Sequence, residues 1–249
     1  MRRLLLIPAL AASLVATDTV SASESSKGRD LVNAASIASA RRYAASRSGR
    51  VAFAVVDDEG RVSGLHSSEL FPSASVVKAM LLVAELRKIG DGHVSEYEKS
   101  LLGPMIRVSD NEAAEAVFGQ VGSSGLMRLA HATGMKQFSV PYLFNAQISA
   151  LEQARFFLHL ETHVPAAHRH YAMKLLSSVV GYQRWGIARV ADSRNLKIYF
   201  KGGWRSGIFH QVALIERGGR RVALAVLTSG ESASYGAETQ EGIARRVLR

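Results

Sequence analysis

The stretch FPSASVVKAMLLVAELRKIG, residues 71–90, places a serine and a lysine at the beginning of a predicted helix. Pro72 and the small residues after it interrupt an extended run, and apolar residues at helical spacing then continue to Gly90. Ser75 therefore lies near the free N–H groups of the first turn, and Lys78 follows on the same face. A lysine whose pKa is lowered by burial can accept the proton of a serine hydroxyl and so create a nucleophile. Both residues also have a structural interpretation, Ser75 as a helix cap and Lys78 as a solvated helix residue.

The composition is that of a globular protein. The 249 residues, of which 47% are hydrophobic and 21% charged, are enough for one large domain or two intimate subdomains. The absence of cysteine excludes disulfides, cysteine nucleophiles and thiolate zinc sites. The net charge is +10, but the basic residues are scattered as pairs and form no nucleic-acid-binding module. Electrostatic contact with an anionic cell envelope is a sufficient explanation for this charge.

The N-terminus has the pattern of a secretion signal. Two arginines precede a short apolar stretch, Leu4 to Val15, and small residues continue to Ala22. We therefore expect residues 1–22 to be a signal peptide and the mature protein to be secreted or periplasmic. A membrane anchor is the alternative, which is disfavoured because the apolar run is too short and contains Pro8.

Hydrophobic periodicity predicts strands near both ends of the chain and helices between them. The predicted strands are residues 51–56, 61–65, 196–200, 208–216 and 222–228. The predicted helices are residues 30–47, 76–89, 94–102, 112–118, 124–132, 149–160, 167–180 and 234–248, with a loop at 134–147. This order indicates an α/β (α+β) fold, in which an antiparallel sheet built from both termini carries flanking helices and an inserted all-helical lobe. We expect a single domain over residues 29–249, with an α/β lobe at about 29–70 and 190–249 and a helical lobe at about 71–189.

Two further motifs follow the serine–lysine pair. The triplet SDN at 109–111 opens a predicted helix, where these residue types commonly act as caps. The triplet KGG at 201–203 follows a strand-like run and could form a bend between strands. If it continues the strand, Lys201 and Gly203 point to one side, and the glycine lets a substrate approach the backbone. The three motifs in this order are far more specific than any one of them.

On these motifs the chain resembles the penicillin-recognising serine hydrolase superfamily, and most closely its class A β-lactamase-related branch. The resemblance covers nearly the whole chain after the leader. It implies that Ser75 is the acylated nucleophile and that Lys78 deprotonates it. It further implies that Ser109 relays a proton to the leaving nitrogen. No metal and no cofactor are expected.

The same resemblance implies a set of substrate-binding residues. Asn111 would bond the side-chain amide of the substrate, and Lys201 would supply positive charge for its carboxylate. The backbone N–H groups of Ser75 and Trp204 would hold the oxyanion. The implied substrate-binding residues are Asn111, Lys201, Gly203, Trp204 and Arg205.

Three departures from the family pattern affect the expected chemistry. Class A enzymes carry a glutamate that activates the deacylating water, but here no Asp or Glu occurs between Ala116 and Leu151. The next acid, Glu152, is expected in a capping box. Gly202 replaces the usual hydroxyl residue, a loss for which Arg205 could substitute in part. The stretch between the lysine and the SDN triplet is also shorter than typical, which predicts that part of one cleft wall is missing.

These features together predict a secreted β-lactamase-like serine hydrolase that β-lactams or related amides acylate at Ser75, with slow deacylation. One alternative is a D-alanyl-D-alanine peptidase of cell-wall metabolism. Another is a catalytically weak protein that binds the wall or senses β-lactams. We expect a monomer whose partners are small-molecule substrates.

Overall fold

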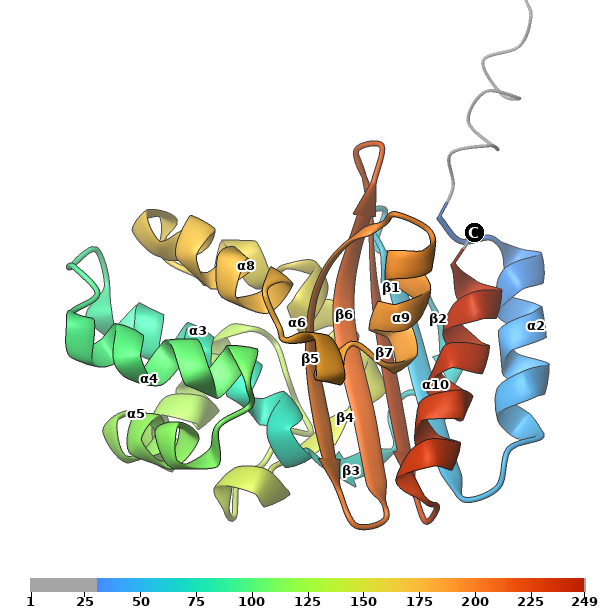
Figure 1. Cartoon of the computed structure of the whole chain (residues 1–249), viewed down its shortest axis with the longest axis horizontal. Helices are drawn as coiled ribbons and strands as arrows, with labels where there is room; N and C mark the ends of the chain where they lie inside the picture. Colours follow the sequence, from blue (N-terminus) through green and yellow to red (C-terminus); the bar gives the residue numbers. More distant parts are fainter. Residues whose placement is uncertain (1–30, 249) are drawn as a thin grey trace, which may run out of the picture. The chain divides into compact units, whose positions relative to one another are not determined.

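The computed structural model describes residues 31–248, and its centre is a five-stranded antiparallel sheet in the order β2-β1-β7-β6-β5 (Figure 1). The strands are β1 (Arg50–Asp57), β2 (Val62–Leu65), β5 (Lys197–Arg205), β6 (Ile208–Arg217) and β7 (Arg220–Ser229). The hairpin of β1 and β2 joins the last three strands because β1 pairs with β7, where Ala54 faces Ala225. The predicted antiparallel sheet built from both ends of the chain is therefore confirmed.

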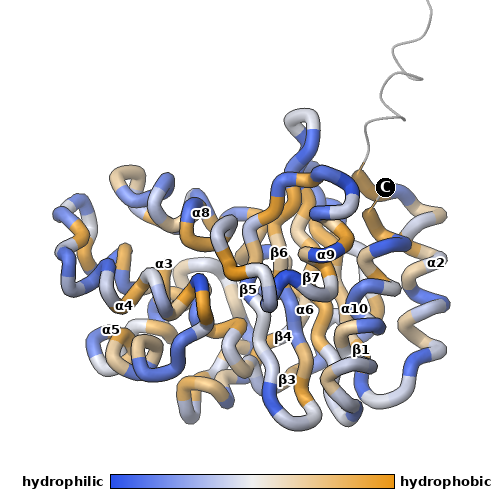
Figure 2. The backbone as a smooth tube through the Cα atoms, viewed as in Figure 1, coloured by the Kyte–Doolittle hydropathy of each residue, from blue (hydrophilic) through white to orange (hydrophobic). Residues whose placement is uncertain are grey.

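Helices cover both faces of this sheet. They are α2 (Ala34–Ala45), α6 (Ala150–Leu158), α9 (Gly186–Ser193) and α10 (Ala233–Val247). Figure 1 shows α9 and α10 in front of the sheet and α6 behind it, packed against β1, β6 and β7. Because the inner strands are covered on both sides, they are continuous apolar runs without alternation, visible as hydrophobic stretches in Figure 2.

The middle of the chain is mainly helical, and α3 lies at its centre. The longer elements are α3 (Val77–Ile89), α4 (Glu96–Arg107), α5 (Asn111–Ala132), α7 (Leu160–His163) and α8 (Arg169–Ser177). Short 3-10 turns are η1 (Ala74–Val76), η2 (Leu143–Asn145), η3 (Ala166–His168) and η4 (Gly181–Gln183). Helix α3 packs against α4 and α5, and every residue from Val77 to Leu86 is buried. One inserted helix, α6, belongs to the packing of the sheet.

Local differences from the expected elements have simple causes. The two helices expected over 112–132 form one element, α5, interrupted at Gly122, where φ is +68°. The expected loop ends in a strand, β4 (Gln147–Ser149), which pairs with β3 (Leu70–Pro72) just before the serine–lysine motif. Strands of three residues are too short to produce a periodic signal in the sequence.

The predicted signal peptide, residues 1–22, lies outside the described residues. Within residues 31–248, no helix has both the length and the apolar character required to cross a membrane.

Candidate active site

Ser75 lies in the 3-10 turn η1, one residue before the end of that turn and two residues before α3 begins. No side chain caps either η1 or α3, so the structure does not support the interpretation of Ser75 as a helix cap. Among the described residues, no acceptor takes the Ser75 N–H and no group hydrogen-bonds its hydroxyl. Ala74, immediately before it, has φ of +44°, a left-handed conformation that non-glycine residues rarely adopt and that is typical of functional turns.

The surrounding strands hold this turn from two sides. The Ser73 N–H donates to the carbonyl of Ala146 at 2.7 Å, which ties the turn to the segment before β4. The buried His210 of β6 donates from Nε2 to the Pro72 carbonyl at 3.0 Å and accepts the Thr228 N–H at Nδ1 at 3.1 Å. His210 is therefore a structural histidine that connects the central sheet to the strand leading into Ser75.

Lys78 is fully buried, one helical turn after the serine. Its Nζ donates to Asn111 Oδ1 at 2.7 Å, to the Ser109 carbonyl, and to Ser109 Oγ at 3.3 Å. Burial lowers the pKa of Lys78 to about 8, against the opposing charges of Asp110 and Glu115. The solvated-lysine interpretation is therefore wrong, and the neutral, basic form of the side chain is a minor species near pH 7 that becomes the major one above about pH 8.

Lys201, on strand β5 of the sheet, also contacts Ser109. Its Nζ donates to Ser109 Oγ at 3.0 Å and to the Gly202 carbonyl at 2.7 Å. Burial, together with the nearby charge of Lys78, holds the pKa of Lys201 well below its ordinary value. The two buried lysines thus meet at one hydroxyl, which gives a path along which a proton can move.

In the SDN triplet, one residue caps α5 and the other two contact Lys78. Asp110 is the cap of α5, because its Oδ1 accepts the Ala113 N–H at 2.8 Å. Ser109 adopts a left-handed φ of +60°, and this turns its side chain and its carbonyl toward the lysines. The capping interpretation therefore applies to Asp110, while Ser109 and Asn111 contact Lys78.

The two glycines of the KGG triplet both lie in close packing. A Cβ added to Gly203 would lie 2.8 Å from the backbone nitrogens of Ser75 and Val76, so β5 approaches the serine turn directly. A Cβ added to Gly202 would lie 3.0 Å from the Trp185 ring. The indole therefore occupies the space of the side chain that the family usually carries at this position.

The last two predicted site residues lie at the outer end of β5. Trp204 is 38% exposed, and its ring lies 5.9 Å from Lys201 Nζ and 6.0 Å, edge to face, from the Trp185 ring. The Arg205 side chain is exposed, and within the described part of the chain it forms no hydrogen bond or ion pair. Trp204 therefore adjoins Lys201 without joining the hydrogen bonds among Lys78, Ser109 and Lys201.

Glu152 does not supply the carboxylate that the family uses for deacylation. Ser149 accepts the Glu152 N–H at 3.3 Å, as expected for a cap, but the carboxylate does not close a capping box. Its Oε1 instead accepts the N–H groups of Lys136 at 2.7 Å and Gln137 at 3.0 Å, which holds the loop after α5. From this loop Phe144 approaches the site, with its ring 5.2 Å from the Nζ of Lys78. Nothing in the sequence indicated this contact.

Gly203→Ala is expected to damage both stability and the site. The added methyl meets backbone atoms that cannot rotate away, so overpacking should cost about 1–3 kcal/mol of unfolding free energy. The shifted serine turn should lower the rate at which a penicillin labels Ser75 covalently, by about tenfold or more. Denaturant melts and labelling rates measure the two effects. The control is Gly103→Ala in α4, whose Cβ meets nothing within 4 Å. A Gly203→Ala protein that behaves like this control would contradict the close approach.

His210→Phe is expected to lower stability by about 2–4 kcal/mol, because it leaves the Pro72 carbonyl and the Thr228 N–H buried without partners. Burial lowers the pKa of His210 to about 4, below the ordinary value near 6.5, so the native state favours the neutral ring. Its contribution to stability is therefore complete above about pH 6.5 and is lost as the pH falls toward 4.

As the pH falls from 7.5 to 5, the unfolding free energy of the wild type should consequently decrease by about 2 kcal/mol more than that of the His210→Phe variant. Urea unfolding at the two pH values measures the difference, and exposed His93→Phe is the matched control. Equal pH dependence in the wild type and the His210→Phe variant would show that the ring is not held neutral.

Comparison with known proteins identifies the same architecture elsewhere. The profile of the Beta-lactamase enzyme family matches residues 97–249, and no curated protein matches the chain. A β-lactamase from Sphaerobacter thermophilus DSM 20745 is 17% identical, with a TM-score of 0.77 over 86% of this chain and 96% of that one. An ancestral class A β-lactamase (GNCA) is 20% identical, with a TM-score of 0.69 over 82% and 95%. A mutant of PBP-A in an acyl-enzyme complex with penicillin G is 14% identical, with a TM-score of 0.74 over 85% and 94%.

Proposed function

Because the chain belongs to the beta-lactamase enzyme family, we propose that it is a serine hydrolase whose Ser75 is acylated by β-lactams or related amides. The observation that carries the proposal is the convergence of two buried lysines on Ser109, with Lys78 one turn after Ser75. This arrangement supplies a base, a proton relay and a nucleophile in one place. The PBP-A mutant with the same fold is itself an acyl-enzyme complex with penicillin G.

In the proposed acylation, neutral Lys78 takes the proton of the Ser75 hydroxyl while Ser75 Oγ attacks the amide carbonyl of the substrate. The C–N bond then breaks, and Ser109 gives its proton to the departing nitrogen. The Lys78 ammonium formed in the first step also hydrogen-bonds Ser109 Oγ and returns its proton to that oxygen, while Lys201 stabilises the negative charge on it through its own hydrogen bond. The free N–H of Ser75, with that of Trp204, would stabilise the oxyanion, while Asn111, Gly203 and Arg205 border the substrate.

We propose that hydrolysis of the acyl-enzyme is slow. In residues 31–248 no carboxylate is hydrogen-bonded to Lys78, and the loop that follows α5 presents Phe144 to that lysine. A water molecule at the ester would thus lack a strong base beside it. Glu152, the first acid in the chain after Glu115, is committed to the N–H groups of the loop.

The test is to mix the protein with a fluorescent penicillin and to follow the adduct by intact-mass spectrometry. We expect an adduct of one penicillin on Ser75 that persists over many minutes. Rapid multi-turnover hydrolysis would refute slow deacylation, and the absence of any adduct would refute acylation.

A second candidate function is a D-alanyl-D-alanine peptidase, which the lack of a carboxylate hydrogen-bonded to Lys78 within the described chain favours. The measurement is release of D-alanine from a peptide that ends in D-Ala-D-Ala. Release from the wild type, and not from a protein whose Ser75 is already penicilloylated, would assign the peptidase activity to this site. Binding of penicillin and peptide without turnover of either would instead indicate a wall-binding or β-lactam-sensing protein.

We also propose that the protein acts outside the cytoplasm as a monomer, after removal of residues 1–22. The arginine-led apolar N-terminus supports export, and the net charge of +10 favours contact with an anionic envelope. N-terminal sequencing of the exported protein tests this proposal, with Ser23 as the expected first residue.

A further inference from the structure

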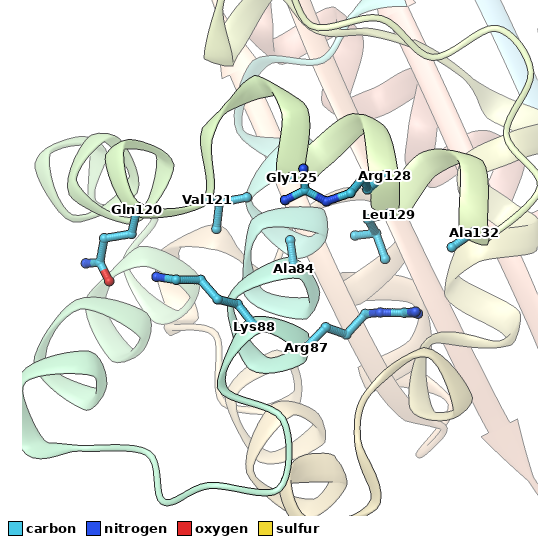
Figure 3. Close-up of a pocket in the computed structure, with 9 residues that line it drawn as sticks. All are labelled: Ala84, Arg87, Lys88, Gln120, Val121, Gly125, Arg128, Leu129 and Ala132. Atoms are coloured by element: carbon cyan, nitrogen blue, oxygen red, sulfur yellow. The ribbon is translucent and has the colours of Figure 1, made fainter.

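A hollow lies between α3 and α5, at the end of α3 away from the serine turn (Figure 3). Its volume is about 550 Å³. Arg87 and Lys88 line it from the last turn of α3, and Gln120 and Arg128 line it from α5. With a rise of about 1.5 Å per residue, Arg87 lies roughly 13 Å along the helix from Lys78, so this hollow is separate from the candidate active site.

The hollow carries positive charge that the described protein does not neutralise. Arg87 and Arg128 form no ion pair with any acid in residues 31–248. Lys88 pairs with Glu85 at 3.3 Å, and Glu85 is almost completely buried. Both arginines therefore remain available to an anion that enters the space between the helices.

The helix dipole explains only part of this arrangement. Arg87 and Lys88 complement the C-terminal end of α3, which is a common stabilising placement. Arg128 lies on α5, across the hollow, and serves no such purpose for α3. Figure 3 shows its guanidinium extended over Gly125, where an added Cβ would lie 3.7 Å from Arg128 Nη2 and 2.6 Å from Val121. The glycine leaves room for the Arg128 side chain, while Arg87 and Lys88 line the same hollow from α3 and extend in opposite directions along it.

The floor of the hollow is apolar, and its size exceeds that of a simple ion. Ala84 and Leu129 contribute aliphatic surface between the cations. A space of about 550 Å³ accommodates a small organic molecule as well as its anionic group. Guanidinium groups match the geometry of phosphate oxygens through paired hydrogen bonds, and a nearby ammonium adds a point charge.

We propose that this hollow binds the phosphate group of an organic phosphate, with Arg87 and Arg128 as its main ligands and the apolar floor under its organic part. A smaller hollow of about 380 Å³ shares Arg87 and is lined also by Arg169. A longer ligand with a second anionic group can extend into it. The phosphate could belong to a soluble ester or to an anionic lipid headgroup, and both present the same chemistry to the arginines.

The test uses the full chain and two probes, phenyl phosphate and vesicles of phosphatidylglycerol, with phosphatidylcholine vesicles as the neutral reference. Saturable binding of phenyl phosphate, followed by calorimetry or NMR, supports a soluble ligand. Saturable binding to phosphatidylglycerol vesicles alone assigns the site to a lipid headgroup. Binding of neither probe would overturn the proposal.

The matched variants separate this site from general electrostatic attraction. Arg87→Gln combined with Arg128→Gln should weaken binding of the active probe about tenfold or more. Arg42→Gln combined with Lys174→Gln makes the same change in net charge at two exposed positions elsewhere. This control pair should change the affinity for the same probe by less than about twofold. Equal weakening by both pairs would refute a specific site, and thermal melts establish that each variant is folded.

Discussion

Replacing Ser75 with alanine is expected to abolish the covalent penicillin adduct, with at least about a 10⁴-fold loss of acylation rate. The hydroxyl is the only group of η1 that can attack a carbonyl from beside the free N–H of the same residue. Stability should change by less than about 0.5 kcal/mol, because the hydroxyl forms no hydrogen bond with a described residue. Intact-mass spectrometry after incubation with penicillin measures the adduct, and a urea melt measures the stability.

The matched control for this substitution is Ser124→Ala, an exposed serine on α5. It should be labelled at the wild-type rate. An adduct that forms on the Ser75→Ala protein as fast as on this control would place the nucleophile elsewhere and refute the proposed mechanism.

Lys78→Met is expected to lower the acylation rate about 10³-fold, because it removes the base and leaves the serine proton without an acceptor. In the wild type the pKa of Lys78 is lowered to about 8, and only the neutral amine can accept a proton. The wild-type rate should therefore rise about tenfold per pH unit below 8 and level off above it. The variant should lack this rise. Stopped-flow labelling with a fluorescent penicillin from pH 6 to 9.5 measures both profiles.

The control for Lys78 is Lys174→Met, an exposed lysine on α8 with the same change of charge. It should keep the wild-type profile. Lys78→Met removes the cost of burying an ammonium but leaves Asn111 Oδ1 and the Ser109 carbonyl without this donor, so we expect only a small net change in stability near pH 7. A variant that retains the pH dependence would show that another group is the base.

Much of the architecture could be predicted from the sequence because its strong signals are local. The apolar runs of β1, β6 and β7 indicated strands at both ends of the chain, and the structure pairs them in one antiparallel sheet. The order of the three motifs predicted membership in the penicillin-recognising serine hydrolases, which the family match confirms. Weak or very short signals were missed, above all the pairing of β3 with β4 that supports the serine turn.

The candidate site could be predicted only as a set of residues. Sequence patterns placed Ser75, Lys78, Ser109 and Lys201 in the expected order, and they also showed that a deacylation glutamate is missing from its usual place. They could not show that Phe144 faces Lys78, or that Glu152 is committed to the loop N–H groups. Such contacts depend on how distant segments pack, and no local pattern records them.

The serine–lysine pair, the strands at both ends and the absence of cysteine chemistry can all be read from the order of the residues. The contact of Lys201 with Ser109, 92 residues apart, and the position of Gly203 against the turn of Ser75 are visible only in the folded chain. The physical reason is that a lowered lysine pKa and a close backbone approach both come from burial. Burial is produced by the packing of the whole chain, whereas helix and strand patterns are properties of neighbouring residues.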